Sequence, residues 1–398
     1  MKMSKNISSV TASGLCLYCG ACYSICPADA IFFNDEIDLQ PAINNKCIKC
    51  GKCLKVCPGL KPLKTDEGDP LLGPIQKCYL GYSSDPEIRF RSSSGGIISS
   101  FNKYLLQNKI VDGIICIRQS RESIYKNEVI LATSVDQVLS AAGSRYAPAY
   151  VCSGFKDLPL KDKGNYAIVG KPCDIQAAIK YTGIAKKYNF FKIAIFCAQT
   201  PSMSATRKIL KLNNIDDNQV TSIQYRGNGW PGFFTVISKN GEVLFKKEYH
   251  VVWNQILCRA KFSNKRCFLC HDCTGENADI SVGDAWLDEL KGKSDGHSVI
   301  ITRSEIGEKY INDCIKKIIL ILNTINPDII IESQKNLLSK KQNIYLKRLA
   351  ARLIGQNVPV EEIRYDRTTN HIKKIAGYTK YFILKKIIHN KLYLGGKR

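Results

Sequence analysis

The chain has 398 residues, enough for two or three domains, and its 44% hydrophobic and 23% charged residues are typical of a folded globular protein rather than a disordered one. It lacks an apolar run of the about 18 residues that a transmembrane helix needs, and its polar, basic start lacks the apolar segment of a signal peptide, so we expect a cytoplasmic location. The net charge is +23, of which residues 335–398 carry +13 (16 Lys and Arg minus 3 Asp and Glu), so the charge describes the C-terminal tail more than the rest of the chain.

The 18 cysteines are the unusual part of the composition. In reducing compartments cysteines serve as thiols, metal ligands or cluster ligands more often than as disulfides. Most of them also fall in three tight groups, whereas a disulfide scaffold would spread them along the chain.

Residues 1–62 contain two copies of one pattern, C-x2-C-x2-C-x3-C-P. In this pattern three cysteines of a copy bind one [4Fe–4S] cluster, and the fourth binds the cluster of the other copy. We therefore assign the ligands of cluster one to Cys16, Cys19, Cys22 and Cys57, and those of cluster two to Cys47, Cys50, Cys53 and Cys26. A pair of structural zinc sites is the alternative, but zinc more commonly uses two separated Cys pairs.

A linker at 61–74 leads into alternating strand and helix patterns. Apolar runs predict buried strands at 111–117, 166–170 and 191–197, and apolar spacing predicts a helix at 97–107. Added β-structure is expected at 221–227 and 233–247, the latter a hairpin that turns at Asn240 and Gly241.

Beyond Ser304 the pattern is helical and rich in Lys. The predicted fold is a mixed α+β and α/β chain. Its parts are a ferredoxin-like domain at 1–62, an α/β flavin-binding domain at 75–310 and a helical basic region at 311–398.

A third cysteine group, Cys267-x2-Cys270-x2-Cys273, lies in the larger domain, and Cys173 and Cys197 each follow a predicted strand. If these strands are parallel neighbours, both thiols leave the sheet at its carboxyl edge, where α/β folds bind ligands. A third [4Fe–4S] cluster on the first two cysteines of the group and these two thiols is the favoured interpretation, with the last cysteine spare or replacing one of them. A zinc site within the group and inert buried thiols are the alternatives. The remaining cysteines are expected to be core or surface thiols: Cys78, Cys116, Cys152, Cys258 and Cys314.

Two polar segments are candidate cofactor contacts. Residues 92–96 (SSSGG) directly precede the predicted helix, whose first N–H groups favour an anion such as a pyrophosphate, although Ser and Gly also mark loops and N-caps. Residues 142–146 offer the guanidinium of Arg145 and the ring of Tyr146 to a phosphate or a flavin. Neither segment is specific by itself.

Together these motifs resemble the beta subunits of coenzyme F420-reducing hydrogenases and dehydrogenases, a family that includes the 7-hydroxymethyl chlorophyll a reductases. The resemblance covers roughly residues 10–310, and besides the cysteine repeat it is carried by residues 91–100, 140–148, 169–177, 195–202, 225–232 and 267–286. It implies FAD in the α/β domain beside a [4Fe–4S] cluster. It further implies that the flavin exchanges hydride with a deazaflavin and the clusters pass single electrons to or from a ferredoxin or a second subunit.

The resemblance also implies residue roles. The expected cofactor-binding residues are Ser93, Ser94, Gly95, Gly96, Gly143, Ser144, Arg145, Tyr146, Gly283, Asp284 and Trp286, and the expected third-cluster ligands are Cys173, Cys197, Cys267 and Cys270. Cys273 departs from the two-cysteine form of the motif. Lys171 stands where a smaller or apolar residue is common, and we interpret it as a candidate contact for a phosphate or a deazaflavin tail. No catalytic side chain is identified.

The leading functional hypothesis is an iron–sulfur flavoprotein oxidoreductase, which connects a two-electron hydride carrier, coenzyme F420 or a similar molecule, to one-electron carriers through FAD and [4Fe–4S] clusters. The alternatives are a non-catalytic ferredoxin-type subunit that docks on a partner enzyme, and a ferredoxin-dependent reductase of a specific organic substrate. The expected partners are a ferredoxin or a partner redox subunit and a small hydride carrier. Nucleic acid is not expected because no nucleic-acid motif accompanies the charge. The basic tail at 372–398 could contact an anionic membrane surface, bind an acidic partner or be a solvated helix.

Overall fold

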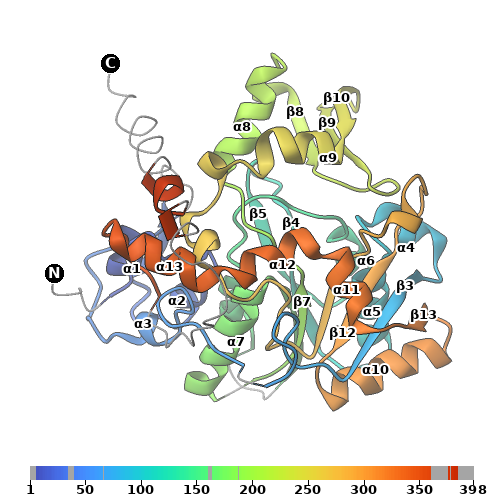
Figure 1. The fold of residues 1–398 in the computed structure, drawn as a ribbon, viewed down its shortest axis with the longest axis horizontal. Coiled ribbons are helices and arrows are strands. Elements are labelled where there is room, and N and C mark those ends of the chain that lie inside the picture. The colour runs from blue at the N-terminus through green and yellow to red at the C-terminus, as the bar shows by residue number, and fades with distance from the viewer. Residues whose placement is uncertain are drawn as a thin grey trace.

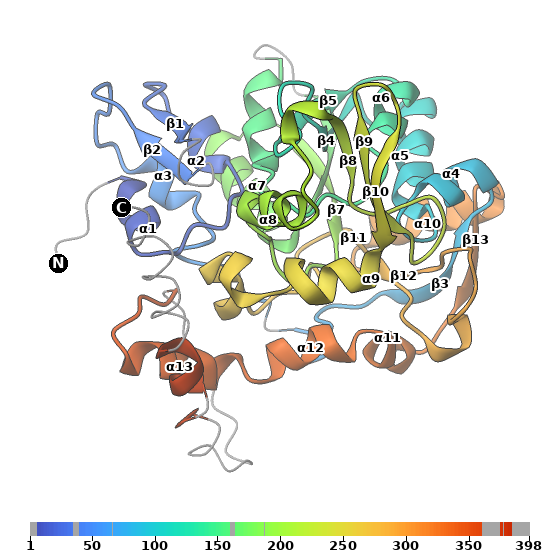
Figure 2. The ribbon, with the colours of Figure 1, turned by 90° about the horizontal axis from the view of Figure 1, so that it is seen from above.

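The computed structural model of the chain describes residues 6–34, 40–65, 67–159, 164–186, 188–359, 375–376 and 378–383. A small N-terminal domain lies at one end of a larger α/β body, and the C-terminal helices run across one side of that body (Figures 1 and 2).

The N-terminal domain consists of the helices α1 (Ser8–Ala12), α2 (Ala21–Ser24) and α3 (Lys52–Lys55) and an antiparallel pair of strands, β1 (Ile31–Asn34) and β2 (Gln40–Ile43). The one-turn helices α2 and α3 begin directly after Gly20 (φ 86°) and Gly51 (φ 73°). This left-handed conformation costs a residue with a Cβ about 1–2 kcal/mol, which explains a glycine at the same place in both copies of the cysteine pattern.

The body is built on an eight-stranded sheet in the order β13-β3-β12-β11-β7-β6-β4-β5. Its strands are β3 (Lys77–Ser83), β4 (Gly113–Gln119), β5 (Asn127–Ala132), β6 (Asn165–Gly170), β7 (Asn189–Ile195), β11 (Ile280–Asp284), β12 (Ser298–Thr302) and β13 (Leu320–Thr324). The four central strands β11, β7, β6 and β4 are parallel, so their carboxyl ends share one edge.

Helices cover both faces of this sheet (Figure 1). One core joins the strands to α5 (Ile97–Gln107) and α10 (Glu305–Lys316), for example through Phe101, Ile114 and Ile311. The opposite face packs against α7 (Pro172–Ala185) and the 3-10 helix η2 (Val151–Asp157). The body also contains the short helices α4 (Pro86–Arg91) and α6 (Val135–Ser140).

A second, three-stranded antiparallel sheet has the order β10-β9-β8. It comprises β8 (Val220–Gln224), β9 (Phe233–Ser238) and β10 (Val243–Glu248), and it packs with α8 (Met203–Leu212) and α9 (Tyr249–Val252) around a separate apolar cluster. Gly241 turns the β9–β10 hairpin with φ 84°, as predicted from the Asn-Gly pair.

The predicted helix at 97–107 is confirmed without a shift, and the predicted strands are found within two residues of their expected starts. The expected helical pattern beyond residue 304 is found in most of that region, but it missed β13, which pairs antiparallel with β3 at the sheet edge. A strand of five residues between two helices is too short for its apolar pattern to be distinguished from that of the helices around it. Helix α10 also crosses the expected boundary at residue 310, and its Ile311 and Cys314 belong to the core of the sheet.

Three helices follow, α11 (Pro327–Ser333), α12 (Lys335–Gln342) and α13 (Ile344–Leu353). Among the described residues, no helix is long and apolar enough to cross a membrane. Most of the basic segment 372–398 lies outside the described residues. Phe382 is described, and it is buried beside α13 in a small cluster with Leu269 and Ala350.

Candidate redox site at the carboxyl edge of the sheet

The carboxyl edge of the parallel strands gathers most of the predicted site residues. Strands β6 and β7 pair in parallel from Asn165↔Asn189 to Gly170↔Ala194. Cys173 lies in the first turn of α7, directly after β6, and Cys197 lies two residues beyond the end of β7. The prediction that both thiols leave the sheet at one edge is confirmed.

Cys267 and Cys270 approach these two thiols. Burial raises the pKa of Cys197, and the nearby Cys267 and Cys270 thiols raise it further. Burial likewise raises the pKa of Cys173, to which Cys197 and Cys270 contribute. These effects on the pKa values require the four sulfur atoms to lie near one another, although they come from three separate segments of the chain. The structure therefore brings together the four cysteines that the sequence singled out.

Cys273 points elsewhere. Its backbone carbonyl accepts a hydrogen bond of 2.9 Å from the N–H of Cys197, but its side chain is buried in an apolar cluster with Leu72 and Leu337. The thiol therefore packs against α12, although Cys270 lies near enough to contribute to the rise of its pKa.

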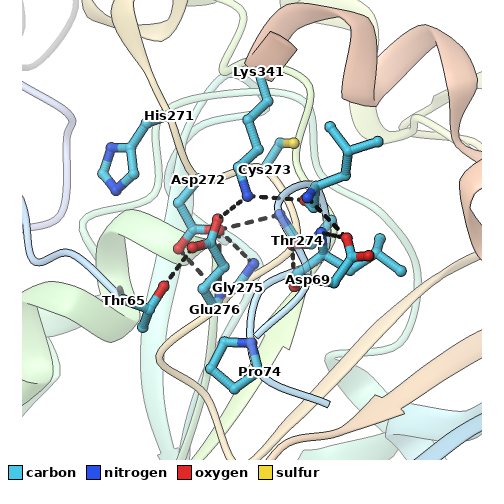
Figure 3. Close-up of polar contacts among 12 residues, drawn as sticks. Thr65, Asp69, Pro74, His271, Asp272, Cys273, Thr274, Gly275, Glu276 and Lys341 are labelled. Atoms are coloured by element: carbon cyan, nitrogen blue, oxygen red, sulfur yellow. Dashed lines mark hydrogen bonds and ion pairs between the residues drawn. The ribbon is translucent and has the colours of Figure 1, made fainter. Parts of the chain in front are cut away.

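The loop that carries Cys273 is held by a polar network (Figure 3). Asp272 Oδ1 accepts hydrogen bonds from the backbone N–H groups of Thr274, Gly275 and Glu276 at 2.7–3.3 Å. The Glu276 carboxylate accepts from Thr65 Oγ1 at 2.5 Å and from Lys341 Nζ at 2.8 Å. The loop is thereby tied both to the interdomain linker and to α12.

A second tie fixes the linker. The buried Arg303 guanidinium donates through Nη1 to the carbonyls of Leu72 and Pro74, both at 2.7 Å. Its Nη2 donates to the carbonyl of Thr274 at 3.1 Å. One side chain from the end of β12 therefore holds the linker against the cysteine loop.

Lys171 lies beside this cysteine group and not at an open surface. Its Nζ donates to Asp174 Oδ2 at 2.7 Å, and both side chains are buried. Burial alone would lower the pKa of Lys171, but the Asp174 carboxylate outweighs it and holds that pKa above its usual range. The Lys171 ammonium group, which the sequence suggested as a phosphate contact, thus already binds the Asp174 carboxylate.

A second polar centre lies at the end of β11. The buried guanidinium of Arg226 binds Asp284 with two hydrogen bonds of 2.7 and 2.6 Å. It also lies 4.6 Å from the ring centre of Tyr249 and 5.1 Å from that of Trp286, whose side chain is 40% exposed. Trp230 Nε1 donates to Asp284 at 3.2 Å. The result is a cluster of aromatic and charged side chains that is partly open to solvent at Trp286.

The Ser-Gly segment meets this centre. Ser93 Oγ accepts a hydrogen bond of 2.7 Å from the N–H of Ser144 and donates to the carbonyl of Arg226 at 3.4 Å. Ser94 Oγ donates to the carbonyl of His297 at 2.8 Å. The predicted segments 93–96, 143–146 and 283–286 are therefore assembled around Arg226.

The glycines of these segments allow close packing. A Cβ on Gly95 would lie 2.8 Å from the carbonyl oxygen of Gly81, and a Cβ on Gly283 would lie 2.3 Å from the Phe196 ring. Gly96 and Gly143 have φ of 77° and 98°. The N–H of Gly95 is already bound, to Ser298 Oγ at 3.0 Å.

The other two residues of the 143–146 motif face inward. Arg145 is buried and donates to Asn127 Oδ1, Gln119 Oε1 and the carbonyl of Ile223, so it joins the main sheet to β8. Tyr146 stacks on Tyr249 with 5.5 Å between ring centres. Both side chains are thus held by other residues of the chain.

The first copy of the ferredoxin pattern is buried against the body. Burial raises the pKa of Cys22, and Cys19, Cys16 and Cys57 add to the effect. These four cysteines also line one small cavity together with Tyr150. The structure thus groups the four cysteines assigned to cluster one.

The second copy is more open. Cys50 is exposed and Cys47 half-buried. Burial raises the pKa of Cys53, with contributions from Cys50 and Cys26.

Among the described residues no three His, Cys, Asp or Glu side chains lie close enough to hold a single metal ion, whereas a [4Fe–4S] cluster takes one thiolate at each of its four corners.

Arg266 connects the first and third groups, and no sequence pattern indicated it. It is buried, precedes Cys267 directly, and its Nε donates to the carbonyl of Gly59 at 3.2 Å. Its positive charge favours the thiolates of both Cys57 and Cys270 and so acts to lower their pKa values against the larger effect of burial. One cation therefore lies between the two cysteine groups.

Comparison with known proteins covers most of the chain. Residues 78–155 and 163–328 match models of the N-terminal and C-terminal parts of the coenzyme F420 hydrogenase/dehydrogenase beta subunit, and residues 9–78 match a 4Fe-4S dicluster domain. The coenzyme F420 hydrogenase subunit beta of Methanococcus voltae is 30% identical over 295 residues, which cover 70% of this chain and 95% of that protein. The chain belongs to the family of coenzyme F420 hydrogenase/dehydrogenase beta subunits.

Two further proteins are similar to the chain, one in sequence and one in fold. One component of the F(420)H(2) dehydrogenase of Methanosarcina mazei is 25% identical over 77% of this chain and 84% of that protein. A chain from the F420-reducing [NiFe] hydrogenase complex of Methanosarcina barkeri has the same fold, with a TM-score of 0.57 at 21% identity over 74% of this chain and 98% of that chain.

Sequence reasoning missed Arg226 and Phe196 as site residues. Both lie inside segments that carry the family resemblance, 225–232 and 195–202, so the signal was present but did not separate them from their neighbours. The C-terminal family model ends at residue 328, so Lys341 and the helices α12 and α13 lie beyond it.

Proposed function

We propose that this family member is an iron–sulfur flavoprotein oxidoreductase that connects a two-electron hydride carrier, coenzyme F420 or a close analogue, to one-electron carrier proteins. The observation that carries the proposal is the order of the groups in space. It runs from the exposed second copy to the buried first copy and across Arg266 to the third cysteine group. Because β11 pairs with β7, the next group along the sheet edge is Asp284 with Arg226. This order suits a path for single electrons that ends at a two-electron centre.

Twelve cysteines are the proposed cluster ligands. Cluster one is bound by Cys16, Cys19, Cys22 and Cys57, cluster two by Cys47, Cys50, Cys53 and Cys26, and cluster three by Cys173, Cys197, Cys267 and Cys270. When bound, such clusters supply one-electron transfer. The chain contributes burial around the first and third groups and the positive charges of Arg266 and Lys171, which favour thiolate ligands and the more negative reduced state of a cluster.

Two features of the site at Arg226 support the proposal of FAD. Ser92 Oγ is buried without a hydrogen-bond partner among the described residues, and a ligand with acceptor oxygens would satisfy it. The open face of Trp286 offers a flat apolar surface to a ring. When bound, FAD supplies the exchange between hydride and single electrons. Arg226 fixes Asp284 and Trp286, and the Ser93–Ser144 hydrogen bond holds the two segments that approach the cofactor.

The hydride carrier is proposed from relatives whose names include coenzyme F420 hydrogenase, F420-dependent formate dehydrogenase and coenzyme F420-dependent sulfite reductase. Lys171 is not part of this proposal as a tail contact, because Asp174 already binds its ammonium group. The proposed role of Lys171 is a fixed positive charge beside cluster three.

The deciding measurement is iron and flavin on one anaerobically purified sample. About 12 iron atoms and one FAD per chain are expected from three clusters. About 8 iron atoms without flavin would contradict the proposal and favour a ferredoxin-type subunit that docks on a separate enzyme. Reduction of coenzyme F420 by the same sample, with reduced ferredoxin as the electron donor, then tests the hydride carrier.

Cys173→Ala and Cys273→Ala form a matched pair for the third cluster. The first variant should lose about four iron atoms per chain, because it removes a proposed ligand. The second should keep them, because that thiol faces α12. Equal iron contents in the two variants would overturn the ligand assignment.

A further inference from the structure

The second cysteine copy forms an exposed face. Cys50 is exposed, Ile48 is 65% exposed, and Lys49, Lys52 and Lys55 are exposed around them. Helix α3, which follows Cys50, lies at the end of the molecule away from the main sheet (Figures 1 and 2). We call the surface formed by Ile48, Lys49, Cys50, Lys52 and Lys55 the lysine face.

Its charge has one sign. Residues 40–64 contain six lysines and no Asp or Glu, and the acidic residues of this domain all precede residue 39. None of the ion pairs between described residues involves Lys49, Lys52 or Lys55. The positive charge of this face is therefore available to a partner.

The matching part of the first copy has neither property. No charged residue lies between Cys16 and Cys26, and Leu17, Tyr18 and Ala21 are buried. The same cysteine pattern is therefore buried by the rest of the protein in the first copy. In the second copy it is exposed to solvent and surrounded by lysines.

We propose that the lysine face is the docking surface for a small acidic one-electron carrier protein of the ferredoxin type. This inference rests on the proposed function, since it assumes a cluster at the second copy. Lysines around an exposed redox centre attract an acidic partner and raise its association rate, and an apolar residue at the centre of such a face is removed from water on contact. Ile48 takes that position.

The step itself is simple. One electron leaves the reduced cluster of the carrier, which is oxidised, and enters the cluster of the second copy, which is reduced; the reverse direction uses the same contact. No bond forms or breaks, and no group is transferred. Transfer depends on close approach, which the exposed Cys50 permits.

The test compares two triple variants of the full chain with the unchanged protein. Lys49→Gln/Lys52→Gln/Lys55→Gln neutralises the lysine face. Lys239→Gln/Lys246→Gln/Lys247→Gln removes equal charge from the exposed β9–β10 hairpin. The probes are a small ferredoxin of negative net charge and, as a basic control, cytochrome c.

With the acidic ferredoxin we expect at least about a tenfold rise in Kd for the first variant at low salt, together with a shallower dependence on ionic strength. The hairpin variant should bind as the unchanged protein does, and cytochrome c should not favour the lysine face. Equal binding by both variants would overturn the proposal. Binding of phosphatidylserine vesicles through these lysines, without ferredoxin binding, would overturn it in favour of a membrane surface.

Binding is measured separately from iron and flavin content. Absence of flavin or of the third cluster would count against the proposed function, but the effect of the lysine substitutions on ferredoxin binding could still be interpreted. Normal cofactor content with unaltered ferredoxin binding in the first variant would count against the docking surface alone.

Discussion

The two cysteine copies share a local structure but differ in what surrounds them. Each has a positive-φ residue before its second cysteine, Tyr18 at 58° and Lys49 at 56°, and a positive-φ glycine after it. In the first copy the intervening side chains are buried, Tyr18 beside Tyr150 and Met203, and Ala21 beside η2 and α7. In the second they are lysines and an exposed isoleucine.

This difference shows that the ability to bind a cluster and the exposure of that cluster to solvent are set by different residues of the motif. The cysteine spacing and the backbone conformation are common to both copies and suit the same cluster. The residues between the cysteines decide whether the copy faces the protein or the solvent. On the proposed electron path they therefore decide which copy is the inner and which the outer end.

The largest expected effect is a difference in iron release. Brief treatment with an oxidant and a chelator should release about four iron atoms from the second copy first, because Cys50 is open to solvent while Cys19 and Cys22 are buried. Iron release followed over time should show this fast phase, and Cys50→Ser should lack it. A single phase in the unchanged protein would contradict the comparison.

The next effect is on stability, and the matched pair is Gly20→Ala and Gly51→Ala. Both introduce a Cβ at positive φ, at a cost of about 1–2 kcal/mol. A Cβ on Gly20 would also lie 2.6 Å from the carbonyl oxygen of Tyr150, whereas one on Gly51 meets nothing within 4 Å. Overpacking adds about 1–3 kcal/mol to the first variant.

Denaturation of anaerobic samples should therefore show a clearly lower midpoint for Gly20→Ala than for Gly51→Ala. Equal midpoints would mean that the first copy does not depend on its contact with η2.

A smaller effect concerns the reduction potentials. Arg266→Met should lower the potentials of clusters one and three, because it removes a positive charge near Cys57 and Cys270. A tenfold change in the ratio of reduced to oxidised cluster, about 59 mV for one electron, is the expected size. Redox titration followed by electron paramagnetic resonance measures it.

Arg266→Lys keeps the charge and is the control for altered packing. The potential of cluster two should not change in either variant. An equal shift of all three potentials would show that Arg266 does not act between the first and third groups.

The smallest effect is expected at Cys152. Its N–H donates to the carbonyl of Cys19 at 2.8 Å, and its thiol is buried beside the first copy without being a proposed ligand. Cys152→Ala should cost about 1 kcal/mol of stability, as an ordinary core substitution does, and leave the iron content unchanged. Loss of about four iron atoms would instead make Cys152 a ligand.

The sequence could predict those features that depend on local spacing. The helix at 97–107, the Asn-Gly hairpin and the parallel pair β6–β7 all follow from short patterns of apolar and turn residues. The proximity of Cys173 and Cys197 follows from that pair and from the rule for carboxyl edges.

The contacts between distant segments could not be predicted in this way. Arg226 and Asp284 are 58 positions apart, and nothing in either neighbourhood specifies the other. Ser298, which takes up the N–H of Gly95, comes from a strand 203 positions further along the chain. Such pairings depend on the order of strands in the sheet, which a single sequence does not reveal.

The ties on the interdomain linker have a consequence for the speed of electron flow. Arg303 donates hydrogen bonds to the carbonyls of Leu72 and Pro74. The Glu276 carboxylate accepts hydrogen bonds from Thr65 and Lys341. With the linker fixed, the first and third cysteine groups keep one separation, and no swinging of the N-terminal domain is needed between them. Hinge motions of domains take microseconds to milliseconds and slow in viscous solvents. Transfer inside this chain should therefore proceed at the same rate in glycerol as in water, and only the encounter with a partner should slow.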